Sequence, residues 1–95
     1  MKESKLQTQV IKFLKSKGCY VIKTQPGAGI PVGCPDIIAL FEGCWLAIEC
    51  KADAKSSYQP LQEETLEKLD EWSYAKMICP QNWSIIKQEL EAFIG

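Results

Sequence analysis

Histidine and arginine are absent from this 95-residue sequence, and none of its five cysteines belongs to a C-x-x-C pair. The chain therefore contains no His or Cys cluster that could act as a catalytic centre or bind zinc. The number of cysteines is odd, and most of them fall within apolar stretches typical of strands. We expect them to be buried free thiols in a reducing compartment rather than disulfides.

Long hydrophobic runs are also missing. No stretch approaches the roughly 20 apolar residues of a membrane-spanning helix, and no signal-peptide core is present. Repeats, linkers and low-complexity tracts are absent as well. Since 46% of the residues are hydrophobic, we predict a single domain over residues 1–95 that is soluble, has no membrane partner and is cytoplasmic in a bacterial or phage-infected cell.

The charged residues are divided unevenly along the chain. Residues 1–55 hold eight lysines and five acidic residues, whereas residues 56–95 hold three lysines and seven acidic residues, which gives net charges of +3 and −4. A phosphate polymer could approach from the lysine-rich side. A solvated lysine face on an ordinary helix explains the same pattern, and charge alone favours that explanation.

A predicted β-hairpin lies at the centre of the sequence. Residues 37–41 and 44–48 are apolar runs of strand length, and Glu42-Gly43 separates them as a short turn. If the turn has two residues, Phe41 faces Cys44 and every other pair is fixed by counting back. Glutamate is not a favoured first residue of such a turn, and a bulge there would shift the count by one.

Two carboxylates and a lysine are predicted to share one face at the open end of this hairpin. Counting back places Asp36 opposite Glu49, with their Cβ atoms roughly 4.5–5.5 Å apart. Strand alternation puts Lys51 on the same side and Cys50 on the opposite, apolar side. Opposed carboxylates need a compensating cation, which could be Lys51 or a divalent ion with oxygen ligands. The alternative is a surface salt bridge between Lys51 and one of the two acids.

Three further polar residues could reach this site, and each has a simpler explanation. Glu3 continues the inward-facing stripe of a first helix, although an acid in a first turn also complements the helix dipole. Gln7 lies one turn further along. Gln59 lies at the mouth of a second helix, where it could equally be an exposed amide. The glycine-rich loop 25–34 allows close backbone approach to a phosphodiester, or it merely connects two strands.

The predicted elements follow the order α-β-β-β-α-β-α, which indicates an α/β fold. Gly18 is expected to end the first helix, Pro60 to occupy the first turn of the second with Ser56 or Ser57 as its cap, and Asn82 to cap the third. Leu61 and Trp72 are among the apolar residues expected on the inner face of the second helix. The expected helices cover residues 1–17, 58–72 and 83–95, and the strands outside the hairpin cover residues 19–24 and 74–79.

The hairpin residues resemble a known pattern. Pro35-Asp36, followed by a hairpin and then by Glu49-Cys50-Lys51, is similar to the motif of the PD-(D/E)xK nuclease superfamily. Other details resemble its VRR-NUC family, whose small stand-alone members are similar to Holliday junction resolvases: Glu3, Gln7, the glycine-rich residues 27–33 and Ser57-Tyr58-Gln59. The resemblance covers residues 3–77. It implies a restriction-endonuclease-like α-β-β-β-α-β core, in which helices flank a mixed sheet, and a C-terminal helix.

The resemblance also implies a function. It predicts a metal-dependent, structure-specific DNA endonuclease that hydrolyses phosphodiester bonds at four-way junctions or other branched DNA, in recombination or repair. Asp36 and Glu49 would bind Mg²⁺, with the Cys50 backbone carbonyl as a third ligand. Glu3 would hold a metal-bound water or a second metal. Mn²⁺ should substitute, whereas Ca²⁺ should bind with poor turnover.

The remaining roles concern the attacking water, the DNA and the assembly. Lys51 would position or deprotonate the water, and Gln59 would orient a water or a phosphate oxygen. Because no helix follows the glycine-rich loop in phosphate-loop register, no nucleotide cofactor is expected. Relatives of this size resemble symmetric resolvases, so we expect a homodimer, and a phage or prophage origin would suit so compact a member. The predicted DNA contacts are Lys5, Gln7, Lys23, Gly29, Gly33 and Lys55.

Two alternatives to this function stay open. The chain could be a non-catalytic DNA-binding or assembly module that has kept the motif, and metal-dependent nicking would distinguish a nuclease from it. It could also be a nuclease that cuts simple duplex DNA. Comparing linear duplex with a junction substrate would separate that activity from resolution of branched DNA.

Overall fold

The computed structural model describes residues 1–95 and has the predicted order of elements. The strands are arranged β1-β2-β3-β4 in one sheet. β1, β2 and β3 pair antiparallel, and β4 returns parallel to β3 after α2, so the sheet is mixed as expected. The elements are α1 (Glu3–Ser16), β1 (Tyr20–Lys23), β2 (Ile37–Phe41), β3 (Cys44–Cys50), α2 (Gln62–Trp72), β4 (Tyr74–Ile78) and α3 (Trp83–Ile94).

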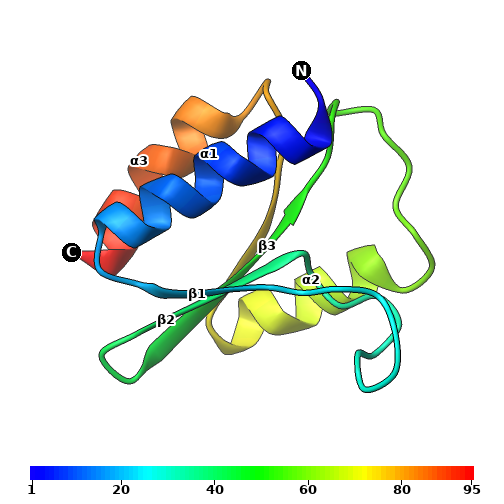
Figure 1. The fold of residues 1–95 in the computed structure, drawn as a ribbon, viewed down its shortest axis with the longest axis horizontal. Helices are drawn as coiled ribbons and strands as arrows, with labels where there is room; N and C mark the ends of the chain where they lie inside the picture. Colours follow the sequence, from blue (N-terminus) through cyan, green and yellow to red (C-terminus); the bar gives the residue numbers. More distant parts are fainter.

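Helices cover both faces of the sheet. α1 and α3 lie side by side on one face and α2 lies on the other (Figure 1). Alternation along the strands sends one set of side chains to each layer. The main core joins α1 and α3 to the apolar hairpin face that the alternation predicted: Leu6, Val10, Leu14, Ile37, Ala39, Leu46, Ile48, Cys50, Ile86 and Leu90. A smaller cluster of Ala47, Leu66 and Ala75 lies under α2.

The hairpin turn has two residues and no bulge. Glu42 and Gly43 both have positive φ, at 42° and 82°, which is the geometry that matches the twist of the flanking strands. Phe41 pairs with Cys44, and the ladder continues without interruption to Ile37 opposite Ile48. The predicted register is therefore confirmed, although glutamate is an unusual residue at this position.

The start of α2 differs from the prediction. The helix begins at Gln62 rather than at residue 58, so Pro60 is not in its first turn and neither Ser56 nor Ser57 caps it. Leu61 precedes it in a left-handed conformation, with φ of 67°. A Cβ atom placed on Gly33 would lie 2.9 Å from the Leu61 carbonyl carbon, so these two backbones are in close contact. This tertiary contact fixes the chain before the helix starts.

Several side chains at the ends of elements are more exposed than expected. Leu61 and Trp72 of the α2 region are 54% and 64% exposed, so neither belongs to the core. Asn82 is the residue directly before α3, but its side chain makes no capping hydrogen bond to that helix. Its amide accepts a hydrogen bond from Cys79 N and donates one to Met77 O of β4. None of the helices is both long and apolar enough to cross a bilayer.

The prediction of free cysteines is confirmed, and the prediction that they are buried holds for three of the five. All five thiols are free, and Cys19, Cys50 and Cys79 are buried. Cys44 is exposed beside the hairpin turn, and Cys34 is half-buried near the end of the β1–β2 loop. Buried thiols behave here as small apolar side chains, because burial raises the pKa of Cys19 and Cys50 above the ordinary value.

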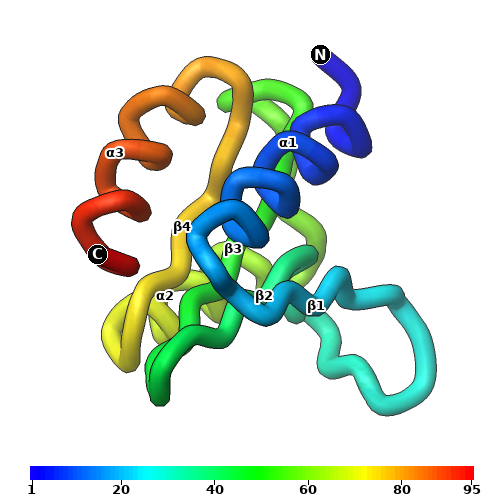
Figure 2. The backbone as a smooth tube through the Cα atoms, turned by 60° about the vertical axis from the view of Figure 1, so that its left-hand side comes forward, coloured from blue at the N-terminus to red at the C-terminus, as the bar shows by residue number.

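One face of the sheet is only partly covered. α2 packs against β3 and β4, and the part of the same face that β1 and β2 form has no helix over it. Tyr20 and Ile22 of β1 and Leu40 of β2 are 71%, 41% and 41% exposed. They are neighbours, because Tyr20 pairs with Leu40 across the ladder. The loop between β1 and β2 extends away from the sheet beyond this region (Figure 2).

Candidate active site

The predicted carboxylates and lysine come together where β2 begins and β3 ends. Asp36 directly precedes β2, Glu49 is the second-last residue of β3, and Lys51 directly follows that strand. Lys51 Nζ lies 3.5 Å from Glu49 Oε2, and the two side chains are only 8% and 3% exposed. The pair is therefore not an exposed surface salt bridge. Burial of both charges is costly unless further groups satisfy them.

Hydrogen bonds hold Asp36 at the end of the hairpin. Its Oδ2 accepts a hydrogen bond of 3.0 Å from the Cys50 backbone N–H. Its backbone carbonyl accepts one of 2.8 Å from Thr24 N, which ties β1 to the same corner. Lys51 N–H donates to Ile78 O on the β4 side. Since successive strand residues point their backbone groups to opposite edges, the Cys50 carbonyl faces the Asp36 side.

Gln62 completes this arrangement, and the sequence interpretation missed it. Its Oε1 accepts hydrogen bonds from Lys51 Nζ at 2.9 Å and from the Gln59 backbone N–H at 2.7 Å. Its Nε2 donates to Glu49 Oε2 at 3.0 Å. Gln62 is 8% exposed, whereas the Gln59 side chain is exposed and makes no hydrogen bond of its own. The buried amide of the site therefore belongs to Gln62, and only the backbone of Gln59 contributes.

A different boundary for α2 would have revealed Gln62. The expected helix began at residue 58, which placed Gln59 at its mouth and Gln62 one turn inside. In the structure Gln62 is the first residue of α2. The sequence does contain a signal for this role. Gln62 is a glutamine at the start of the helix that follows Lys51 and the next loop.

Glu49 has one carboxylate oxygen without a partner. Its Oε1 is buried and makes no hydrogen bond. The pKa of Glu49 is raised to about 7, chiefly by burial and also by the negative charges of Asp36 and Glu3, whereas Lys51 acts to lower it. A buried carboxylate oxygen that lacks a donor fits a cation, because an oxygen ligand and a positive charge satisfy each other.

The first helix contributes less directly. Glu3 is exposed in the first turn of α1, and its charge acts on Glu49. No group of three His, Cys, Asp or Glu side chains is arranged to hold a metal ion. The two roles predicted for Glu3, holding a metal-bound water or a second metal, both stay predictions. Gln7, one turn further, is 9% exposed and turns inward.

A hollow of about 430 Å³ adjoins the carboxylates. We call it the loop hollow, because residues of the β1–β2 loop form most of its wall. Asp36 and Gln62 lie at its inner side, so it opens directly onto the site. Its full lining is Thr24, Pro26, Gly27, Ile30, Pro31, Val32, Gly33, Cys34, Asp36, Gln59 and Gln62.

The predicted DNA contacts are spread around this region. Lys5, Lys23, Lys55 and Gly29 are exposed. Gly33 lines the loop hollow, and its lack of a side chain also permits close contact with the Leu61 backbone. Gln7 is buried in the α1 layer, so it can reach DNA only at the inner end of the site.

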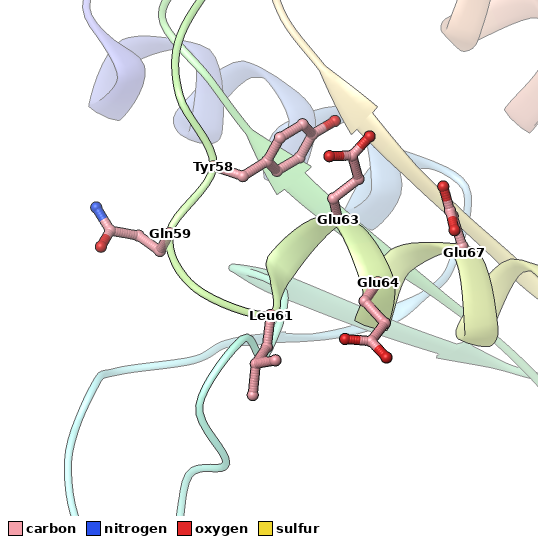
Figure 3. A pocket seen from close by; sticks show the side chains of 6 residues that line it. All are labelled: Tyr58, Gln59, Leu61, Glu63, Glu64 and Glu67. Atoms are coloured by element: carbon pink, nitrogen blue, oxygen red, sulfur yellow. The ribbon is translucent and has the colours of Figure 1, made fainter.

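A second hollow lies at the start of α2 and has the opposite character (Figure 3). Glu63, Glu64 and Glu67 of α2 line it beside Tyr58, Gln59 and Leu61. Three carboxylates in one hollow repel a phosphate backbone. Lys51 Nζ lies 5.6 Å from the centroid of the Tyr58 ring. A polyanion would therefore reach the site from the loop and α1 side, and not along α2.

Known proteins resemble this chain in sequence and in fold. A family described as "Archaeal holliday junction resolvase (hjc)" matches residues 2–92. A solved structure of Hjc from Archaeoglobus fulgidus, described as a Holliday junction resolvase from an archaeal hyperthermophile, aligns with a TM-score of 0.53 at 21% identity over 80% of this chain and 67% of that one. This likeness confirms the predicted fold. No curated protein matches the chain.

Proposed function

Because the chain belongs to the archaeal Holliday junction resolvase (Hjc) family, we propose that it is a structure-specific endonuclease that hydrolyses phosphodiester bonds at four-way DNA junctions. The observation that carries the chemistry is the group of Asp36, Glu49 and Lys51 at the open end of the hairpin. Gln62 hydrogen-bonds the buried Glu49 and Lys51, and the Cys50 N–H hydrogen-bonds the half-buried Asp36. Buried charges on this scale are costly for stability, and such a cost is typical of a functional site.

The proposal includes a Mg²⁺ ion, for which Mn²⁺ should substitute. Asp36 and Glu49 would hold it, with the Cys50 carbonyl oxygen as a third ligand, since these are the hard oxygen donors that such ions prefer. The unpartnered Glu49 Oε1 supports this assignment. When bound, the ion supplies Lewis acidity and lowers the pKa of a water ligand.

The chain's own residues orient the water and the phosphate. The Lys51 ammonium lies beside Glu49 and places a positive charge where negative charge grows on the phosphoryl oxygens. Gln62 fixes both side chains in one arrangement through its two amide atoms. The Cys50 N–H fixes the orientation of Asp36. The catalytic geometry is thus pre-organised by groups that need not move during the reaction.

We assign this set to the PD-(D/E)xK type and, within it, to the VRR-NUC pattern. The order of Pro35-Asp36, the hairpin and Glu49-Cys50-Lys51 supports the first assignment. Glu3 in the first turn of α1 and the glycine-rich loop that leads to Asp36 support the second. Gln62 takes the role that the sequence interpretation had given to Gln59.

The junction would approach along the lysine-bearing side. Lys5 of α1 and Lys23 of β1 are exposed, whereas α2, on the other face of the sheet, carries five of the twelve acidic residues (Figure 1). Lysines contact phosphates through charge and do not read sequence. Such contacts therefore favour recognition of the branched shape of the DNA over recognition of a particular base sequence.

A homodimer is the second part of the proposal. The uncovered face of β1 and β2, with Tyr20, Ile22 and Leu40 exposed side by side, supports it. Contiguous apolar side chains on a sheet face are typical of an interface, and two-fold symmetry is the commonest assembly. A two-fold dimer would present two sites to the two strands that a resolvase must cut.

The test is cleavage of a labelled four-way junction in Mg²⁺, with and without EDTA. Asp36→Asn and Lys51→Ala should each abolish cutting, because each removes one charged member of the site. The matched controls Glu71→Gln and Lys68→Ala change exposed residues of the same charge on α2 and should cut as the wild type does. Equal cutting by the site variants would place the activity elsewhere. Junction binding without cutting in any divalent metal would indicate a binding module, and equal cutting of linear duplex would indicate a general nuclease.

A further inference from the structure

The loop hollow has a lining that a phosphate site does not need. Its outer wall consists of Pro26, Ile30, Pro31 and Val32. Ile30 and Val32 are 38% and 69% exposed, so the loop holds apolar side chains in contact with water. Exposed apolar groups beside a polar site are characteristic of ligand contact.

A continuous DNA duplex offers these side chains little to bind. Its outer surface consists of phosphates, sugars and the polar edges of the bases, whereas the apolar faces of the bases are stacked inside. A base exposes an apolar face only when it leaves the stack, and proteins bind such bases between aromatic or apolar side chains. The chemistry of the hollow therefore matches an unstacked base.

The hollow is also in the right place and of the right size. Asp36 and Gln62 line both the hollow and the catalytic site, so the hollow adjoins the place where the scissile phosphate would lie. Its volume of about 430 Å³ lies within the roughly 300–1,000 Å³ of small-ligand sites. At its rim, the exposed Gln59 amide makes no hydrogen bond within the chain and is free to bond the edge of a base.

We propose that the loop hollow receives one unstacked base next to the scissile phosphate, and that this contact contributes to the choice of branched DNA. The inference rests on the proposed nuclease function and adds a means of substrate selection to it. Extruding a base from an intact duplex is costly, and the cost is least where stacking and pairing are already interrupted. The point of strand exchange in a junction is such a place, so the hollow would be filled there at lower cost than within an arm.

The experiment uses a four-way junction with 2-aminopurine, whose fluorescence rises when it leaves the stack. The probe is placed in turn at the nucleotides that flank the mapped cleavage phosphate, and binding is measured in EDTA so that the junction stays intact. The wild-type chain should raise the fluorescence at one flanking position and should leave the same base in a linear duplex unchanged. The double variant Ile30→Ser and Val32→Ser should bind the junction without the rise.

Cleavage rates give the second measurement. In Mg²⁺, the double variant should lose roughly ten-fold in its preference for junction over duplex, the loss expected when one base contact is removed. The matched control is Ile85→Ser, which changes a side chain that is 60% exposed on α3, and it should keep both the fluorescence rise and the preference.

The outcomes separate this inference from the function on which it rests. A wild-type chain that cuts junctions without any fluorescence rise, or a double variant that retains the rise, would overturn the base-binding role and leave the nuclease function standing. A wild-type chain that neither binds nor cuts junctions would overturn both.

Discussion

Gln62 Nε2 donates a hydrogen bond of 3.0 Å to Glu49 Oε2, so the first residue of α2 holds a carboxylate at the end of β3. The same amide accepts from Lys51 Nζ at 2.9 Å. One neutral side chain thus hydrogen-bonds both members of a buried ion pair and fixes the distance between them, and only Glu49 Oε1 is left without a partner. Buried charges that are fully hydrogen-bonded can be kept without a large loss of stability, whereas a buried charge that loses its partner is strongly destabilising.

Replacement of Gln62 by leucine should affect both folding and cleavage. The variant leaves Lys51 and Glu49 each without a hydrogen bond, which should lower the free energy of unfolding by about 1–3 kcal/mol per unsatisfied group. Junction cleavage should fall by roughly 10–100-fold, because the positions of two catalytic side chains are no longer fixed. Urea unfolding and single-turnover cleavage measure the two effects. Gln88→Leu, an exposed position on α3, is the control, and equal behaviour of the two variants would contradict the role of Gln62.

Glu49 should make the stability of the metal-free chain depend on pH. Its folded-state pKa is raised to about 7 from an ordinary value of 4.5. The contribution of Glu49 to the free energy of unfolding is fully present below pH 4.5 and is lost as the pH rises through about 7. The reason is that ionising this carboxyl group costs more free energy in the folded chain, where it is buried, than in the unfolded chain. The full loss is at most about 3 kcal/mol at pH 8.

The comparison of wild type with Glu49→Gln in EDTA isolates this effect, since other groups titrate in both proteins. The difference in unfolding free energy between pH 5 and pH 8 should be larger for the wild type. Addition of Mg²⁺ should raise the melting temperature of the wild type more at pH 8 than at pH 5, because the ion binds the ionised carboxylate. A pH dependence that is the same in both proteins would show that Glu49 titrates normally.

Gly33→Ala should destabilise the chain more than Gly29→Ala. The two glycines lie in one loop and have φ of 85° and 88°, so an alanine at either position adopts a left-handed conformation at a cost of roughly 1–2 kcal/mol. Only at Gly33 would the added Cβ lie 2.9 Å from the Leu61 backbone, whereas at Gly29 it meets nothing within 4 Å. Thermal unfolding of the pair measures the contact. Equal losses would mean that the Gly33–Leu61 approach can widen freely.

Leu40→Asp should dissociate the proposed dimer. A charge in the centre of the uncovered β1–β2 face would be desolvated by a partner, which should raise the dimer dissociation constant by roughly 30-fold or more, the factor for a loss of about 2 kcal/mol. Sedimentation velocity over a range of protein concentrations measures it. Ile85→Asp on α3 is the control for an exposed apolar-to-acid change. A wild-type chain that is monomeric with and without junction DNA would rule out the dimer.

Local sequence patterns were sufficient for the hairpin. The turn length fixes which residues face each other, and strand alternation then fixes the side of each side chain. For this reason the meeting of Asp36, Glu49 and Lys51 could be predicted from residue counts, and the structure confirms the register that the prediction needed. The carboxylate pair and the buried opposite face both depend on this kind of short-range information.

The start of α2 depended on contacts that no local pattern contains. Pro60 and the two serines before it favour an earlier helix, but the approach of Leu61 to Gly33 places a left-handed residue directly before Gln62. These two residues are far apart in the sequence, and their contact is a property of the folded chain. The error of a few residues at this boundary placed Gln59, and not Gln62, at the predicted mouth of the helix.

The separation of charge between the two helical layers has a consequence before any contact is made. α1 carries exposed lysines on one side of the sheet, and α2 carries Glu63, Glu64 and Glu67 on the other. With a net charge of only −1, the chain behaves in the field of a polyanion chiefly as an electric dipole, which turns the lysine side forward as the molecules approach. Orientation of this kind acts over about a Debye length, roughly 8 Å at physiological salt. A nearly neutral protein can in this way meet DNA with its catalytic face already directed at the phosphates.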